Sequence, residues 1–120
     1  MPLPLYQAKA EMFRCLGHPA RIRILELLSE EDLAVHELLA SVTIEQSNLS
    51  QQLSVLRTAG IVVQRREGPE VIYSLAVPQV RDLLLVARVI LTSMRGVQAE
   101  LVDEQIAQRQ LEHVSCPAVP

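Results

Sequence analysis

Hydrophobic side chains recur every three or four positions in five stretches of the chain, a spacing that predicts five helices. The stretches are residues 5–16, 20–29, 36–41, 45–59 and 78–96. Residues 61–67 and 70–75 are instead rich in β-branched side chains, and Gly68-Pro69 between them predicts the turn of a β-hairpin. A short strand is expected at residues 33–35.

The predicted order is helix, helix, short strand, helix, helix, hairpin and long helix. A helix pair followed by a hairpin is typical of a winged helix-turn-helix fold, mainly α-helical with the small β-hairpin as its wing. A chain of 120 residues has the size of one domain. We assign residues 1–112 to this domain and expect residues 113–120 to form a flexible C-terminal tail.

The start of the helix over residues 45–59 has two interpretations. Thr43 and Gln46 fit a capping box, and a start at Glu45 fits equally well. The end of this helix is predicted by Gly60, because glycine readily adopts the left-handed conformation that often follows a helix.

The same helix divides into a leucine stripe and an uncharged polar face. Leu49, Leu53 and Leu56 are spaced four and three apart, so they lie on one side. Solvent-facing helices usually favour Glu, Lys and Arg over Ser and Asn. Amides and hydroxyls form hydrogen bonds with base edges and phosphates, so this face is predicted to bind double-stranded DNA. The alternative is a helix that is rich in Gln and Ser for no functional reason. The predicted contact residues are Gln46, Ser47, Asn48, Ser50, Gln51 and Gln52.

Three arginines near this helix are further candidates for DNA contact. Arg57 follows the last leucine of the stripe, and Arg65 and Arg66 lie on the first hairpin strand. Neighbours on a strand face opposite ways, so only one of Arg65 and Arg66 can point toward a given groove. A wing arginine can neutralise a phosphate or enter the minor groove. The alternative is a charged edge that prevents strand pairing with other chains.

The last helix is apolar on nearly every face, so it must be covered on more than one side. A second copy of the chain can cover it, which predicts a homodimer through the terminal helices; the alternative is a helix at the centre of a monomer. A two-fold dimer would place its recognition helices on an inverted-repeat operator, about one DNA turn apart. The predicted interface residues are Leu83, Leu84, Ala87, Ile90, Leu91 and Met94.

Three segments resemble signatures of the ArsR/SmtB family of repressors. Residues 13–25 resemble its opening F-x-x-L-x-x-P-x-R-x-x-I-L, residues 46–62 its recognition helix, and residues 65–75 its wing. The match covers about residues 10–90. The resemblance implies a homodimeric winged-helix repressor that is released from its operator by a metal ion or another small signal. It also implies that the major groove is contacted by Gln46, Ser47, Ser50, Gln51 and Gln52.

The family's usual metal sites are missing from this sequence. Ala34 and His36 stand where a Cys-x-Cys pair would lie, and residues 83–110 contain no histidine. Cys15 and Cys116 could form a composite thiolate site for a soft metal or metalloid ion, and no other cofactor is implied. Two alternatives stay open: Cys15 is a small buried hydrophobe, or oxidation of the two thiols is the signal.

The formal net charge is −3, which argues mildly against nucleic-acid binding, yet residues 45–75 carry three arginines and three glutamates. Weak non-specific affinity for DNA is therefore expected. Two cysteines without a signal peptide or an apolar run of membrane-spanning length indicate the reducing cytoplasm and no membrane partner. The sequence offers no nucleophile–base pair or phosphate loop, so an enzyme is not expected. The remaining alternative is a winged-helix protein-interaction module without an inducer site.

Overall fold

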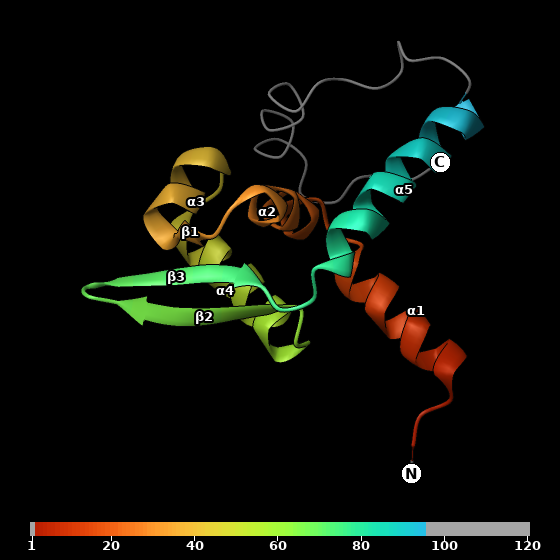
Figure 1. The fold of residues 1–120 in the computed structure, drawn as a ribbon, viewed down its shortest axis with the longest axis horizontal. Coiled ribbons are helices and arrows are strands. Elements are labelled where there is room, and N and C mark those ends of the chain that lie inside the picture. The colour runs from red at the N-terminus through yellow and green to blue at the C-terminus, as the bar shows by residue number, and fades with distance from the viewer. Residues whose placement is uncertain (1, 96–120) are drawn as a thin grey trace.

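The computed structural model describes residues 2–95, which form five helices and three strands (Figure 1). Each predicted element is confirmed to within one residue at either end, apart from the end of the last helix, whose predicted position at residue 96 lies outside the described residues. The expected continuation of the domain to residue 112 and the tail at residues 113–120 lie outside the described residues. The elements are α1 (Leu5–Leu16), α2 (Pro19–Glu30), β1 (Leu33–Ala34), α3 (Val35–Ser41), α4 (Gln46–Thr58), β2 (Val62–Glu67), β3 (Glu70–Leu75) and α5 (Gln79–Arg95).

The strands form one antiparallel sheet in the order β1-β3-β2. Strands β2 and β3 pair from Val62 opposite Leu75 to Glu67 opposite Glu70. Gly68 has a φ of 64°, which the tight turn requires and which glycine adopts without steric cost. The hairpin therefore extends as a two-stranded wing, while β1 pairs only with the part of β3 around Tyr73.

Local sequence explains where the helices begin and end. Pro19 is the first residue of α2, where a missing N–H costs nothing, and His18 caps the helix by accepting a hydrogen bond from Ala20 N at Nδ1 (3.1 Å). Helix α4 begins after Glu45 and ends before Gly60, whose φ is 80°. Of the two interpretations of this start, the capping box of Thr43 and Gln46 is wrong and the start near Glu45 is confirmed, because Glu45 occupies the cap position.

The core lies between α2, α3, α4 and the sheet. Helix α2 packs against α4, β3 and α5, and α4 packs against β2. The predicted leucine stripe of α4 is confirmed, because its three leucines lie in this core. The side chains at the centre of the core are at most 1% exposed: Ile24, Leu25, Leu38, Leu49, Leu53 and Leu56. This core holds α4 firmly by one side and leaves its other side to solvent.

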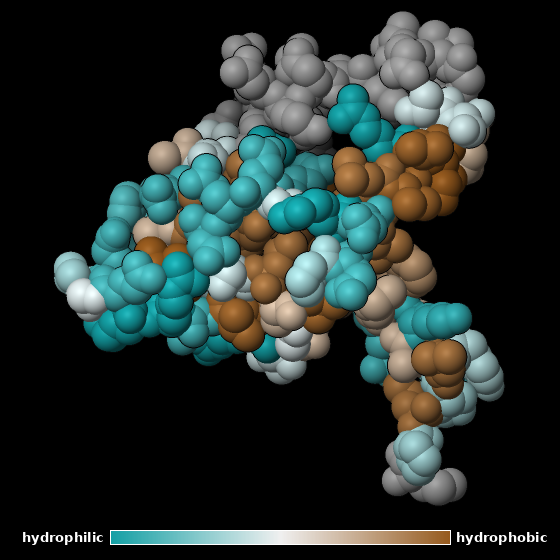
Figure 2. All heavy atoms as spheres, viewed as in Figure 1, coloured by the Kyte–Doolittle hydropathy of each residue, from teal (hydrophilic) through white to brown (hydrophobic). Residues whose placement is uncertain are grey.

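Helix α1 and the outer part of α5 project away from this body (Figure 1). Leu16 is the only residue of α1 that is buried, and Phe13 is 55% exposed. Hydrophobic surface gathers on the projecting end of α5, as Figure 2 shows. Within residues 2–95, none of the helices combines the length and the apolar character needed to cross a bilayer.

Candidate nucleic-acid interface

The solvent face of α4 carries most of the residues that the sequence predicted for DNA contact. Five of them are exposed: Gln46, Ser47, Ser50, Gln51 and Arg57. The four uncharged residues lie in the first two turns of α4, beside the backbone amides of its N-terminus. This end of the helix therefore concentrates hydrogen-bond donors and acceptors that none of residues 2–95 covers.

Gln52 is a correction to the sequence prediction. Its side chain is 7% exposed, so it cannot reach a base edge as expected. Gln52 lies three residues after Leu49 and one before Leu53, and this spacing turns it toward the core side of α4. Its Oε1 accepts a hydrogen bond from Arg21 Nη1 (2.8 Å), and its Nε2 donates to Asn48 Oδ1 (2.9 Å). Asn48 is half-buried at the border between the two faces.

Sequence analysis missed the role of Arg21. Besides its bond to Gln52, its Nε donates to the backbone carbonyl of Cys15 at the end of α1. Desolvation by burial lowers the pKa of His18, and the charge of the same guanidinium lowers it further. No signal in the sequence joins Arg21 to Gln52, because they are 31 positions apart and on different helices.

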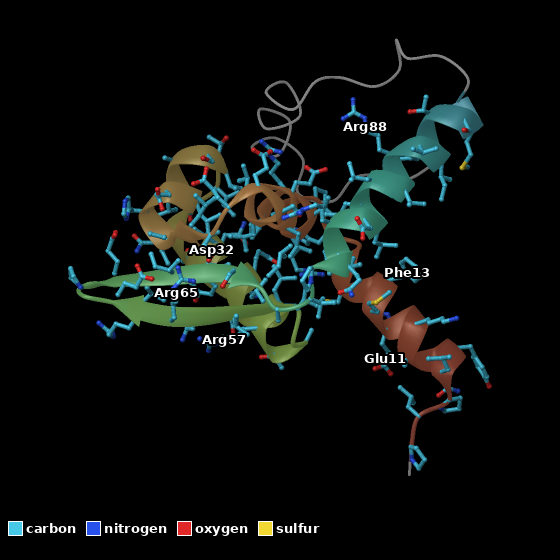
Figure 3. All side chains as sticks on the ribbon, viewed as in Figure 1. Glu11, Phe13, Asp32, Arg57, Arg65 and Arg88 are labelled. Atoms are coloured by element: carbon cyan, nitrogen blue, oxygen red, sulfur yellow. The ribbon has the colours of Figure 1, made fainter. Side chains whose placement is uncertain are left out.

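The two wing arginines differ in their surroundings. Arg65 Nη1 lies 2.9 Å from Asp32 Oδ2 (Figure 3). Arg65 Nε lies 2.6 Å from Glu67 Oε2, so one guanidinium binds two carboxylates. The hydrogen bonds that Arg65 donates to Glu67 and Asp32 raise its pKa above the ordinary value. The side chain of Arg66 is exposed and makes no ion pair or hydrogen bond with any other residue between 2 and 95.

The described part of the chain leaves the predicted metal site untested. Cys15 is half-buried and packs against the core, whereas Cys116 lies outside the described residues. Ala34 is 1% exposed, and His36 is an exposed residue whose Nδ1 lies 3.8 Å from Glu70 Oε2. Residues 2–95 contain no group of three or more His, Cys, Asp or Glu side chains that could hold a metal ion.

The predicted dimer residues fall into two sets. Leu83 and Leu84 are half-buried and pack against the core of their own chain. Ala87, Ile90, Leu91 and Met94 are exposed, as the prediction requires. The sequence analysis did not select three further exposed apolar residues of α5: Leu85, Val86 and Val89. The free apolar surface thus lies farther along α5 than was expected.

Comparisons with known proteins place this architecture in a family. Residues 18–63 match the family described as bacterial regulatory protein, arsR family. The uncharacterized HTH-type transcriptional regulator Rv0081 of Mycobacterium tuberculosis is 54% identical over 102 residues, which span 84% of this chain and 90% of that protein. The HTH-type transcriptional repressor SmtB of the same species is 40% identical over 75 residues, 62% of this chain and 56% of that protein.

Solved structures agree with this assignment. The crystal structure of M. tuberculosis Rv0081 superposes with a TM-score of 0.73 at 57% identity and covers 79% of this chain and 96% of that one. The transcriptional repressor BigR from Xylella fastidiosa gives 0.67 at 34% identity, with coverage of 71% and 87%. A homodimeric winged helix-turn-helix domain from Mycobacterium bovis gives 0.68 at 25% identity, with coverage of 78% and 88%. The chain therefore belongs to the ArsR family of bacterial regulatory proteins, and it is a DNA-binding transcriptional regulator.

Proposed function

We propose that the chain is a homodimeric repressor that binds an inverted-repeat operator, with α4 of each protomer in the major groove. The observation that carries this proposal is the exposed polar face of α4. Gln46, Ser50 and Gln51 present uncharged amides and hydroxyls to solvent, while the leucines of the same helix are buried. These groups suit base edges, since amides bond adenine bidentately and serine bonds bases or phosphates.

The homodimer rests on the apolar surface of α5. Val89 is 63% exposed and Met94 is 75% exposed, on a helix whose first turns already pack on the core. An apolar patch of this kind favours a protein partner over water. The relative from M. bovis is homodimeric, and we infer the same assembly for this chain. The two-fold symmetry then presents α4 twice, as an inverted repeat requires.

Within the wing, Arg66 is the proposed DNA contact and Arg65 has a structural role. Arg65 is already neutralised by Asp32 and Glu67 and joins the base of the wing to the segment before β1. Arg66 carries an open positive charge, as does the exposed Arg57 at the end of α4. Both are suited to phosphate contact, which supplies affinity without sequence preference.

Release of the operator by a metal, metalloid or redox signal is part of the proposal. Cys15 lies at the end of α1, and its own backbone carbonyl accepts a hydrogen bond from Arg21, which also binds Gln52 of α4. A chemical change at the Cys15 thiol would therefore act close to a contact with α4. The test is titration of reduced protein, bound to its operator, with zinc, cadmium, arsenite and peroxide, while fluorescence anisotropy follows release. Loss of the response in Cys15→Ser and in Cys116→Ser supports the thiol site. Release that is unchanged in both variants contradicts it.

DNA binding is tested by selection of duplexes from a random library, followed by titration of the selected operator. Replacement of Gln51 by alanine should weaken specific binding by about 1–3 kcal/mol for a lost bidentate contact. Gln79→Ala removes the same kind of side chain from the start of α5 and serves as the matched control. If the wild-type protein enriches no sequence at low salt, the chain is not a sequence-specific regulator and the protein-interaction alternative gains support.

A further inference from the structure

The Arg21–Gln52–Asn48 chain of hydrogen bonds runs from α2 to the first turn of α4 and rests on donor and acceptor chemistry alone. Arginine has only donors, so Gln52 must turn its oxygen toward Arg21. The amide nitrogen of Gln52 then faces Asn48 and can only donate. Asn48 must therefore present its oxygen inward. Each amide in the chain has one orientation because its neighbour allows no other.

The outward group of Asn48 follows from this order. Its Oδ1 is engaged by Gln52, so the two N–H groups on Nδ2 point away. No hydrogen bond joins Nδ2 to any described residue, and it is not among the fully buried atoms left without a partner. It lies beside the exposed Ser47 and Gln51 in the first two turns of α4. Asn48 thus adds donors to the face that we assign to DNA.

We propose that Arg21, acting through Gln52, sets the polarity of Asn48, so that this position offers DNA a donor and requires an acceptor there. This inference rests on the proposed function of α4. The acceptor is a phosphate oxygen or an acceptor on a base edge in the major groove. We expect no bidentate pair with adenine, because that pair needs the amide oxygen, which is turned inward to Gln52. Arg21 is a positioning residue, and Asn48 is the group that touches DNA.

Gln52→Glu (Q52E) should reverse the direction of the hydrogen bond between residues 52 and 48 in this Arg21–Gln52–Asn48 relay. The new carboxylate keeps an acceptor for Arg21 but cannot donate to Asn48. Asn48 then turns its amide, donates Nδ2 inward and presents its oxygen to DNA, where an acceptor would repel it. The selected wild-type operator should bind about tenfold more weakly. Asn48→Ala (N48A) should produce a loss of similar size, because it removes the donor.

A double-mutant cycle separates this relay from a simple charge effect. If Q52E acts through Asn48, it has no further effect in the N48A background, and the two losses are not additive. If the added negative charge repels DNA directly, the losses add, and this result overturns the proposal. Equal affinity of wild type, N48A and Q52E also overturns it. Circular dichroism melting of each variant confirms that the protein tested is folded.

Substitution of Arg21 supplies a rescue experiment. Arg21→Lys retains a side chain that can only donate, so operator preference should be kept. Arg21→Met frees Gln52 to turn, so operator affinity should fall about tenfold when Asn48 is present and should not fall further in the N48A background. A purely structural arginine would instead lower the melting temperature and weaken operator binding equally with and without Asn48, which contradicts the proposal. If Arg21→Met does not fold, the Q52E cycle decides.

Modified operators identify the acceptor. If it is a phosphate, the effect of N48A vanishes on DNA with a neutral methylphosphonate at one position. If it is a base, the effect vanishes on an operator with one substituted base pair. An effect of N48A that survives every modification overturns the assignment. Failure of the wild type to select any operator would remove the proposed function itself, whereas a selected operator bound equally by all variants would remove only this inference.

Discussion

Replacement of Ile90 by aspartate tests whether the apolar surface of α5 is the dimer interface. Ile90 is 51% exposed in the protomer and lies among apolar neighbours on the projecting half of α5. In a two-fold dimer the substitution would bury one carboxylate from each protomer without a cationic partner. An unpaired buried charge costs about 3 kcal/mol or more, so two cost about 6 kcal/mol per dimer. Because 1.4 kcal/mol is a factor of ten, the dimer dissociation constant should rise about 10⁴-fold.

Sedimentation velocity between micromolar and hundred-micromolar protein measures this change. Wild type should sediment as a dimer and Ile90→Asp as a monomer, with operator affinity lost in parallel. Arg88→Glu is the control, because it places a carboxylate on α5 where the chain already has an exposed charge (Figure 3). A dimer of Ile90→Asp at micromolar concentration would refute the proposed interface.

Three further predictions concern the wing, the core and the cap of α2. Arg66→Ala should flatten the salt dependence of operator binding by about one phosphate contact per protomer, whereas Arg65→Ala should leave that slope closer to wild type; equal slopes would contradict their separate roles. Leu53→Ala, at 1% exposure, should cost about 2–5 kcal/mol of unfolding free energy in urea titrations, and a smaller loss would indicate a core that closes the cavity. The lowered pKa of His18 means that the unfolded chain binds a proton more readily than the folded chain, so stability should fall as pH drops below about 6.5. His18→Asn keeps a capping group and should remove this pH dependence. If the stability of His18→Asn varies with pH as the wild type's does, the role of His18 is contradicted.

The elements and their order were predictable because they follow from local rules. Hydrophobic periodicity identifies a helix or a strand from neighbours within a few positions, and Gly60 and Gly68 mark ends that require positive φ. The leucine stripe of α4 was predictable for the same reason. The Thr43 capping box failed because two adjacent starts satisfy the local pattern, and only packing of the helix chooses between them.

Individual side-chain roles were less predictable. The polarity of Gln52 suggested an outward role, but its position beside Leu49 and Leu53 places it against the core, where Arg21 satisfies it. The sequence alone does not distinguish the roles of the neighbouring residues Arg65 and Arg66. They differ only because Asp32, 33 positions earlier, meets Arg65 at the base of the wing.

The sequence by itself determined the winged helix-turn-helix order, the buried side of α4 and the excess of apolar surface on α5, since each depends on the spacing of side chains along a single element. Tertiary structure alone decided that Gln52 is part of a relay, that Arg65 is neutralised, and that Leu83 and Leu84 belong to their own core. These outcomes depend on which distant segments meet. Hydrogen bonds and ion pairs are short-ranged, so their partners are settled only when the chain has folded.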